Sequence, residues 1–253
     1  MTDVFVVRDD EIRFVGELDD EPRRSAAMSR VTHDLACAGE LSPWRGEPYA
    51  VAPGLGATPW FLLERAAARY FGIHTHAAHV NGVVCADHDT HMWLARRSET
   101  KAIDPGMLDN LVGGGVAAGK SVAATVVKEA WEEAGIPTPL ACLAHNAGTV
   151  QVWREQPDGL QHETIFVHDL WLPAAFLPVG HDGEVVDHRL VPLVEAARLI
   201  GAERGLDVVT ADASLVILDF LIRHGQIAQQ ATAYPALDAL RHPTTSFAGS
   251  SPR

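Results

Sequence analysis

Three glutamates at helical spacing are the side chains of this sequence best placed to do chemistry. Glu129, Glu132 and Glu133 follow the i, i+3, i+4 pattern within "SVAATVVKEAWEEAG", so one face of a helix would carry all three carboxylates. Like charges this close repel one another unless a cation lies among them. Mg2+ prefers hard oxygen ligands, keeps several waters and bridges carboxylates to substrate phosphates. The spacing therefore predicts a magnesium site on these three glutamates, with Mn2+ as an alternative cation.

The glycine-rich stretch before these glutamates fits two motifs that exclude each other. From Gly114 to Ser121 it satisfies G-x-x-x-x-G-K-S, the loop that cradles nucleotide phosphates in ATPases and kinases. Such a loop follows a buried strand, whereas "IDPGMLDNLV" is interrupted by proline, glycine and polar residues. An ATPase also needs a second acid for magnesium, and its candidate, Asp219, lies in a segment with helical spacing. We therefore favour the competing interpretation, in which the glycines lead into the glutamate helix.

Local signals define the helix that presents the glutamates. Ser121 is suited to cap its start, and Gly135 is suited to the left-handed position that closes it. Val126 and Ala130 fall on a neighbouring stripe that can pack on a sheet. We therefore expect the helix to run through Ala134 and to leave its acids at an opening.

The patterns of strand and helix signals divide the chain into two domains. Two short strands, a helix capped by Ser25 and a closing helix from Thr58 to Gly72 predict a small α+β domain over residues 1–73. Strand-like segments then surround the glutamate helix and end in a further helix, which predicts a sheet domain over residues 74–230. Residues 231–253 are expected to form a short helix and a disordered tail. The predicted fold class is α+β.

Composition limits the partners and the compartment. The chain has 253 residues, and 33 acidic against 20 basic side chains give a formal net charge of -13. This charge disfavours nucleic acid and anionic membranes as partners. No apolar run is long enough to cross a bilayer, and the first residues are acidic rather than signal-like, so we expect a cytoplasmic protein. The three scattered cysteines are expected to be reduced and to lie in the core.

The longer pattern from Gly114 to Ile136 resembles the signature of the Nudix hydrolases, G-x5-E-x7-R-E-U-x-E-E-x-G-U, where U is an aliphatic residue. Other segments, among them "HVNGVV", "FVHDLWLP", "DGEVVDHRL" and "LDFLIRHG", look like those of the branch that carries an extra, DUF4743-like N-terminal domain and acts in thiamine diphosphate metabolism. The resemblance spans about Phe61 to Gly225. It implies a Nudix α/β/α sandwich with a mixed sheet, in which metal-activated water cleaves a diphosphate bond.

Two lysines depart from that signature. Lys120 stands where the family usually has Glu, and Lys128 stands where it usually has Arg. Lys128 keeps the charge that can orient the neighbouring glutamates but loses the bidentate fork of arginine. Lys120 reverses a charge near the predicted metal site, which should weaken the binding of further cations and could instead bring a contact to a substrate phosphate.

Further candidate site residues lie outside the glutamate helix. Glu163, on a predicted strand, and Glu184, in a predicted loop, are candidates for an acid that reaches the metal or positions the attacking water. Basic side chains and flexible backbone before the helix could hold phosphate oxygens. These binding candidates are Gly114, Gly115, Arg96, Arg97, Lys101 and Lys120. The histidines lack a ligand set at metal spacing and are expected to be structural.

These observations leave more than one function open. The first is a magnesium-dependent hydrolase of a small organic diphosphate, with thiamine diphosphate or an oxidised form as the expected substrate and ADP-ribose or a dinucleotide as the alternative. The second is a module that binds a diphosphate without cleaving it, because two lysines alter the signature. An isopentenyl diphosphate isomerase ranks lower, because no cysteine and glutamate pair can be placed. Trp60 and Phe61 are candidates for an aromatic wall against the substrate, but core packing is the favoured use of both residues. No pattern indicates an oligomeric state.

Overall fold

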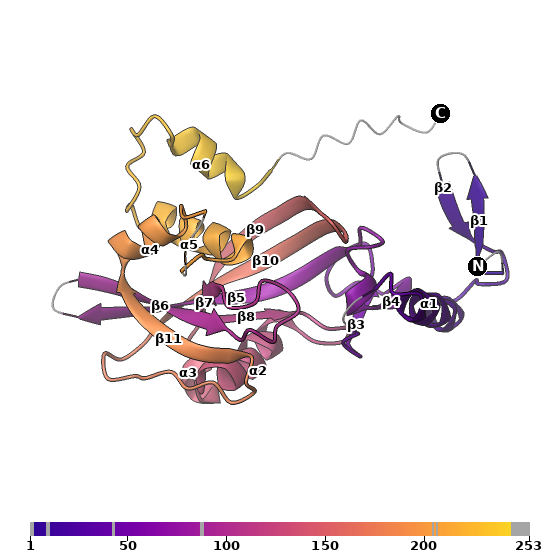
Figure 1. Ribbon diagram of the computed structural model, residues 1–253, viewed down its shortest axis with the longest axis horizontal. Helices are drawn as coiled ribbons and strands as arrows, with labels where there is room; N and C mark the ends of the chain where they lie inside the picture. Colours follow the sequence, from indigo (N-terminus) through magenta and orange to yellow (C-terminus); the bar gives the residue numbers. More distant parts are fainter. Residues whose placement is uncertain are drawn as a thin grey trace.

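The chain folds into a small N-terminal domain that lies beside a larger sheet domain (Figure 1). The computed structural model describes residues 3–8, 11–41, 44–86, 89–203, 205 and 207–243. The N-terminal domain pairs its strands into two antiparallel hairpins around one long helix. Its elements are β1 (Phe5–Arg8), β2 (Glu11–Phe14), α1 (Glu21–Cys37), β3 (Pro48–Val51), β4 (Phe61–Glu64) and the 3-10 turn η1 (Arg65–Ala67).

Two expectations for the N-terminal domain are wrong. Helix α1 is capped by Asp20, which accepts a hydrogen bond from the Arg23 N–H at 2.8 Å, and Ser25 lies inside the helix. The helix expected from Thr58 is replaced by strand β4 and the turn η1. A short apolar run fits a buried strand as well as a helix. Pairing with β3, which buries Leu63 to 1% exposure, decides for the strand.

A mixed seven-stranded sheet forms the second domain. The strand order is β11-β6-β5-β10-β9, β10 runs parallel to β5, and the short strands β7 and β8 pair with β6 and β5. Its strands are β5 (His74–Ala86), β6 (Asp89–Arg97), β7 (Leu108–Asn110), β8 (Val112–Gly115), β9 (His145–Gln156), β10 (Gly159–Trp171) and β11 (Val185–Pro192). Its helices are α2 (Val122–Ala134), α3 (Thr138–Ala141), α4 (Leu193–Leu199), α5 (Ala211–Arg223) and α6 (Tyr234–Leu240).

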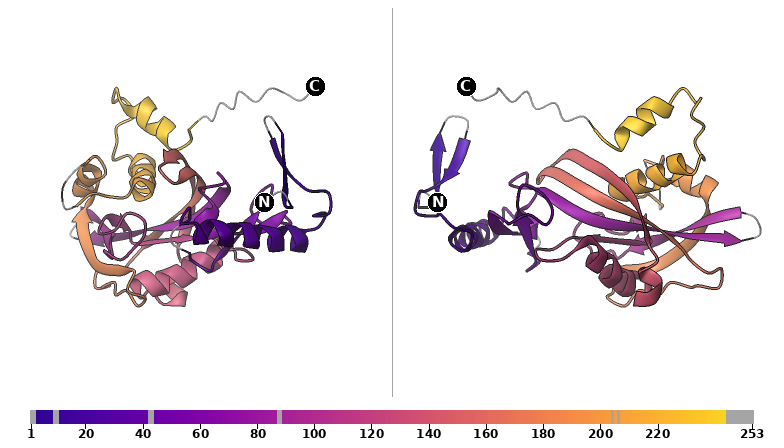
Figure 2. Two further views of the ribbon diagram at one scale, coloured as in Figure 1. Left: turned by 45° about the vertical axis from the view of Figure 1, so that its right-hand side comes forward. Right: turned by 180° about the vertical axis from the view of Figure 1, so that it is seen from behind.

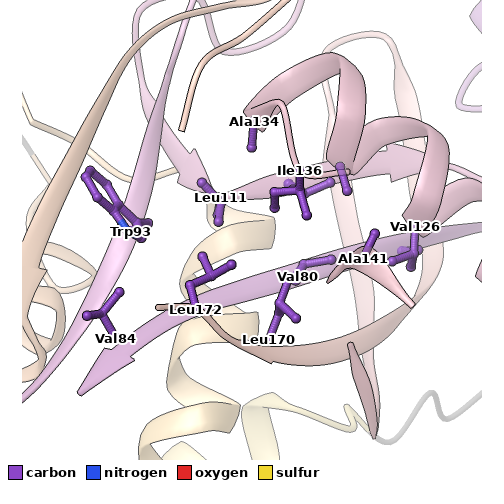
Figure 3. Close-up of a cluster of buried hydrophobic side chains, with 13 residues drawn as sticks. Val80, Val84, Trp93, Leu111, Val126, Ala134, Ile136, Ala141, Leu170 and Leu172 are labelled. Atoms are coloured by element: carbon purple, nitrogen blue, oxygen red, sulfur yellow. The ribbon is translucent and has the colours of Figure 1, made fainter. Parts of the chain in front are cut away.

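Helices cover both faces of this sheet (Figure 2). On one face, Val126 of α2 and Ile136 just after it pack on Val80 and Leu170 of the central strands (Figure 3). On the other face, Phe220 and its neighbours on α5 pack with α4 against β5, β6 and β7. This arrangement confirms the predicted α/β/α sandwich with a mixed sheet. None of the helices in the described ranges is long and apolar enough to cross a membrane.

The cysteine expectation is half right. All three thiols are free, as the scattered spacing suggested, but Cys37, Cys85 and Cys142 are exposed rather than part of the core. The predicted short helix near the C-terminus is α6, whereas residues 244–253 of the predicted tail lie outside the described residues.

Candidate active site

Helix α2 is capped at both ends as the sequence predicts. The Ser121 hydroxyl accepts a hydrogen bond from the Ala124 N–H at 3.1 Å. Gly135 adopts φ 62°, and its N–H donates to the carbonyls of Ala130 and Trp131. Left-handed backbone of this kind favours glycine, because a side chain there is strained. Helix α2 is therefore fixed in length by local signals, which sets the direction of its glutamates.

Strand β8 carries three consecutive glycines, and a different side chain lies against each of them. A Cβ built on Gly113 would lie 3.0 Å from the His79 ring. On Gly114 it would lie 2.4 Å from Cγ of Glu129, and on Gly115 it would lie 1.9 Å from the Tyr49 hydroxyl. The glycines are needed because these side chains occupy the space that a methyl group would fill. Side chains from β5, α2 and β3 thus all pack against the glycine strand β8.

The three glutamates of α2 have different surroundings. Glu129 lines a pocket above the glycine strand. Glu133 is buried at 6% exposure and accepts a hydrogen bond from the Gly113 N–H at 2.8 Å. Glu132 lies further out, where Lys128 donates to it at 2.6 Å and to Glu129 at 2.9 Å. Lys128 therefore does hold two neighbouring carboxylates.

Burial governs the protonation of these acids. Desolvation raises the pKa of Glu129, although hydrogen bonding to Lys128 and the charge of Lys128 act against it. Desolvation also raises the pKa of Glu133 well above its usual range, against the hydrogen bond from Gly113, and the nearby charge of Asp109 adds to the rise. Carboxylates that crowd together out of water are stabilised by a bound cation.

The pocket lies between the two domains and is lined by both acidic and basic side chains. The N-terminal domain contributes Tyr49 and arginines. The sheet domain contributes the glycine strand, Glu129 and the N-terminal halves of β5 and β10. Its acidic lining residues are Asp104, Asp109, Glu129, Asp158, Glu163, Glu184 and Asp212. Its basic lining residues, histidines aside, are Arg45, Arg65, Arg69, Arg97 and Lys101. A pocket with both signs of charge can hold an anion together with a cation.

A second pair of carboxylates lies on the wall opposite α2. Glu163 accepts a hydrogen bond from the Thr75 hydroxyl at 2.9 Å. Asp212, at the start of α5, accepts one from the Gln161 amide at 2.9 Å, while its other oxygen is buried with no hydrogen-bond partner among the described residues. Desolvation and the charge of Glu163 raise the pKa of Asp212 to about 6. A pocket acid whose pKa is raised in this way is typical of functional sites.

The predicted phosphate-binding residues divide into two groups. Gly114, Gly115, Arg97 and Lys101 line the pocket, where Arg97 pairs with Asp109 at 2.7 Å and Lys101 pairs with Glu184. Arg96 does not line it. Its guanidinium instead donates to the Gly106 carbonyl at 2.8 Å and pairs with Asp207. Lys120 is exposed and also lies outside the lining.

Several pocket residues carry no recognisable signal in the sequence. Tyr49, Arg65 and Asp212 carried no motif, and they reach the pocket only through the packing of distant segments. His79 was taken as structural, yet it lines the pocket and its Nδ1 lies 2.8 Å from the Asn110 side-chain oxygen. The expectation of a poor buried strand before the glycines is wrong, because β7 is buried along its length. For His79, the available signal was "HVNGVV" in β5, where the polar residues His79 and Asn81 lie on either side of Val80.

Neither candidate for the aromatic wall lines the pocket, and the favoured core packing holds for Phe61 but not for Trp60. Trp60 is 52% exposed and lies outside the pocket lining, and Phe61 packs in the core of the N-terminal domain. Tyr49 is the aromatic residue that the N-terminal domain places in the pocket.

The donor set suits magnesium in the way that substrate-bridging sites do. Across the part of the chain that the structure describes, no three His, Cys, Asp or Glu side chains form a ready-made metal cage. Mg2+ seldom uses such a cage, since it is held by one or two carboxylates together with water and substrate phosphates. Glu129 is a pocket carboxylate of this kind, with the acid of Glu133 buried beneath it.

Comparison with known proteins identifies the family. The NUDIX domain profile matches residues 75–212, and a domain of unknown function, DUF4743, matches residues 1–75. The chain therefore belongs to the NUDIX domain family and carries a DUF4743 domain before the NUDIX domain. The glycine stretch belongs to the Nudix signature, so the ATPase interpretation is set aside.

Curated relatives align with most of this chain. Nudix hydrolase 24, chloroplastic, of Arabidopsis thaliana is 39% identical over 86% of this chain and 59% of its own length. Nudix hydrolase 20, chloroplastic, of the same plant is 39% identical over 83% of this chain and 56% of its own length. The chain thus spans little more than half of these two proteins. An uncharacterised protein of Saccharomyces cerevisiae is 31% identical over 87% of this chain and 67% of its own length.

Solved structures are less similar in sequence to this chain than these relatives are. The NUDIX domain of Shewanella oneidensis NrtR, complexed with ADP-ribose, has a TM-score of 0.47 and 14% identity over 60% of this chain and 88% of that chain. The MutT protein of Methanosarcina mazei Go1 has a TM-score of 0.45 and 19% identity over 61% of this chain and 96% of that chain. These superpositions say nothing about the substrate of this chain.

Proposed function

We propose that this chain is a magnesium-dependent hydrolase that cleaves the diphosphate bond of a small organic diphosphate. One observation carries the proposal: the Nudix glutamate Glu129 lies on the glycine strand in a pocket that also holds Glu163 and a set of basic side chains. The relatives named as Nudix hydrolases are in keeping with this activity.

The side chains would divide the work as follows. A bound magnesium ion, for which Mn2+ could substitute, would neutralise the diphosphate and lower the pKa of a water molecule. Glu129 is the pocket carboxylate that would hold it, and the predicted ligands Glu132 and Glu133 would complete or support the set. Arg97 and Lys101 would meet phosphate oxygens. Glu163, on the facing wall, would orient the attacking water.

The substrate we propose is thiamine diphosphate or an oxidised form of it, cut between its two phosphorus atoms. The support is the resemblance of segments outside the signature to the thiamine-related branch. ADP-ribose and dinucleotides are the alternatives. The plant relatives are named chloroplastic, so the cytoplasmic location stays a prediction, as does the exclusion of nucleic acid and membranes.

A substrate panel tests the proposal. Purified full-length chain with Mg2+ is given thiamine diphosphate, its oxidised derivatives, ADP-ribose, NADH and nucleoside triphosphates, and kcat/KM is compared by phosphate release and product identity. We expect an oxidised or unmodified thiamine diphosphate to give the highest value. A preference of about tenfold or more for ADP-ribose or NADH, equivalent to about 1.4 kcal/mol in transition-state binding, would refute the thiamine assignment but not the hydrolase assignment.

Variants of the buried and pocket glutamates test the chemistry. Glu129→Gln and Glu133→Gln keep the side-chain shape and remove the charge, so each should lower kcat/KM by about a hundredfold or more while the melting temperature changes little. Glu195→Gln is the matched control, because Glu195 pairs with Arg198 on α4 away from the pocket. Near-normal turnover in both pocket variants contradicts the assigned chemistry.

A non-catalytic binding module is the second candidate function. The observation behind it is that Lys120, in place of the usual acid, is exposed and outside the pocket lining. If magnesium and a diphosphate bind but no product forms over hours, this function is the correct one. Turnover restored by Lys120→Glu would then identify the altered signature as the cause.

A further inference from the structure

The N-terminal domain is anchored to both sides of the pocket. The Ala118 N–H, just after the glycine strand, donates to the Pro48 carbonyl at 2.9 Å. The Leu160 N–H, on the β9–β10 hairpin, donates to the Arg69 carbonyl at 2.9 Å. A Cβ built on Gly159 would lie 2.2 Å from that same carbonyl oxygen. Backbone contacts at two places fix the position of this domain against the catalytic domain, so its side chains can form a precise wall.

Tyr49 presents its hydroxyl to the pocket. The residue is 5% exposed, lines the pocket and has its hydroxyl against Gly115. Within the described residues this hydroxyl forms no hydrogen bond, so it can bond a ligand that enters the pocket. Burial raises the pKa of the phenol, and the charges of Glu163 and Glu129 contribute to the rise. The hydroxyl therefore stays protonated and can donate to an anion in the pocket.

Arg65 lies beside that hydroxyl. Its guanidinium carbon is 5.6 Å from the centroid of the Tyr49 ring and 3.4 Å from a Cβ built on Gly115. Its hydrogen bond within the described residues runs from one terminal nitrogen to Glu47 at 2.8 Å. A guanidinium has five N–H donors, so several remain for planar recognition of phosphate oxygens.

The charge of the opposite wall calls for such donors. On the catalytic side, Arg97 and Lys101 are already paired with Asp109 and Glu184. A diphosphate that enters a pocket lined by several carboxylates needs positive charge and hydrogen-bond donors in addition to these two side chains to offset repulsion. The arginines and the tyrosine of the N-terminal domain supply them.

We propose that the DUF4743 domain is a substrate-binding half of the active site, which holds a phosphate group of the substrate through the Tyr49 hydroxyl and the Arg65 guanidinium. This inference rests on the proposed function, because it assumes that a diphosphate enters the pocket. It assigns to the N-terminal domain a direct part in ground-state binding rather than a purely structural one.

The test compares Tyr49→Phe, Arg65→Gln and Arg65→Lys in the full-length chain. Tyr49→Phe removes one oxygen atom and is the decisive variant, since Arg65 also pairs with Glu47. Tyr70→Phe and Arg13→Gln are matched controls on exposed sites of the same domain, outside the pocket lining. Binding of methylenediphosphonate with Mg2+ is measured by calorimetry, and kinetics are measured on the best substrate of the panel.

We expect Tyr49→Phe and Arg65→Gln each to weaken methylenediphosphonate binding by about tenfold and to raise KM more than they lower kcat, with Arg65→Lys intermediate and melting temperatures unchanged. The inference is overturned if Tyr49→Phe binds the probe as tightly as wild type does, or if the wild-type chain does not bind it. Absence of hydrolysis by wild type, with the probe still bound and the variants still weakened, overturns the hydrolase proposal and supports the binding role.

Discussion

At the scale of single residues, Gly114 is the position where backbone and chemistry meet most closely. Its missing side chain makes room for Glu129, because a Cβ there would lie 2.4 Å from Cγ and 2.5 Å from Cδ of that glutamate. Gly114 is not in the left-handed region, so alanine causes no backbone strain there. The methyl group would instead displace the carboxylate from its place in the pocket.

Gly114→Ala should therefore lower kcat/KM by about a hundredfold while the protein still folds. Gly54→Ala is the control, because it meets no atom within 4 Å and does not require a positive φ. The measurement is kcat/KM on the best substrate together with thermal unfolding. Equal activity of the two variants would show that Glu129 does not act from the position seen here.

At the scale of elements, a chain of buried polar side chains joins the pocket to helix α5. Asn110 of β7 donates to Asn81 of β5 at 3.2 Å, and Asn81 donates to Asp169 of β10 at 3.0 Å. Arg223, at the end of α5, pairs with Asp169 at 2.7 Å. Burial alone would raise the pKa of Asp169, but hydrogen bonds from Arg223 and Asn81 and the charge of Arg223 hold it below its usual value. These bonds tie three strands of the sheet to one helix.

A depressed pKa in the folded state means that Asp169 stabilises the fold at neutral pH. That contribution is complete above the ordinary carboxyl pKa of 3.8 and is lost as the pH falls through the lower folded value. Asp169→Asn should lower the free energy of unfolding at pH 7 by about 3 kcal/mol, since Arg223 loses a buried partner. Urea unfolding between pH 3 and pH 7 checks this, and the variant should lose less stability than wild type below about pH 4. An unchanged pH profile would contradict the role of Asp169.

At the scale of the whole molecule, residues 231–243 pack as part of the sheet domain. Arg241, just beyond α6, pairs with buried Asp219 of α5 at 2.6 Å, and its carbonyl accepts a hydrogen bond from the Gln151 N–H of β9 at 2.8 Å. Asp219, once weighed as a magnesium ligand of an ATPase, thus has a structural partner on each side, since Arg223 also binds it. Arg241 therefore connects the end of helix α6 to α5 and to β9 of the sheet.

Arg241→Gln should lower the free energy of unfolding by about 1 to 3 kcal/mol, because Asp219 is 4% exposed and loses a charged partner. Thermal and urea unfolding provide the measurement. Arg198→Gln, which breaks an exposed pair on α4, should change stability by less than about 1 kcal/mol. If the two variants are equally stable, α6 is not held by this contact.

Helix α2 and the positions of its glutamates were predictable from sequence because their signals are local. The cap at Ser121, the closing glycine at 135 and the spacing of the glutamates each depend on residues within a few positions of one another. The layered arrangement was predicted from the resemblance to the Nudix hydrolases, whereas local signals predicted only the separate strands and helices. The first domain was harder, since the run Phe61–Glu64 satisfies a strand and a helix equally well until β3 lies beside it.

Only the tertiary structure decided the rest of the pocket. Tyr49 and Arg65 from one domain and Asp212 from the start of α5 are far apart in the chain, and no spacing rule connects them. Burial then changed the proton affinity of each group: it raises the pKa of the Tyr49 phenol and brings the pKa of Asp212 to about 6. The sequence by itself therefore determined the NUDIX domain family and the helix that carries the three glutamates. The walls that face this helix, and the protonation of their side chains, depend on which distant segments exclude water together.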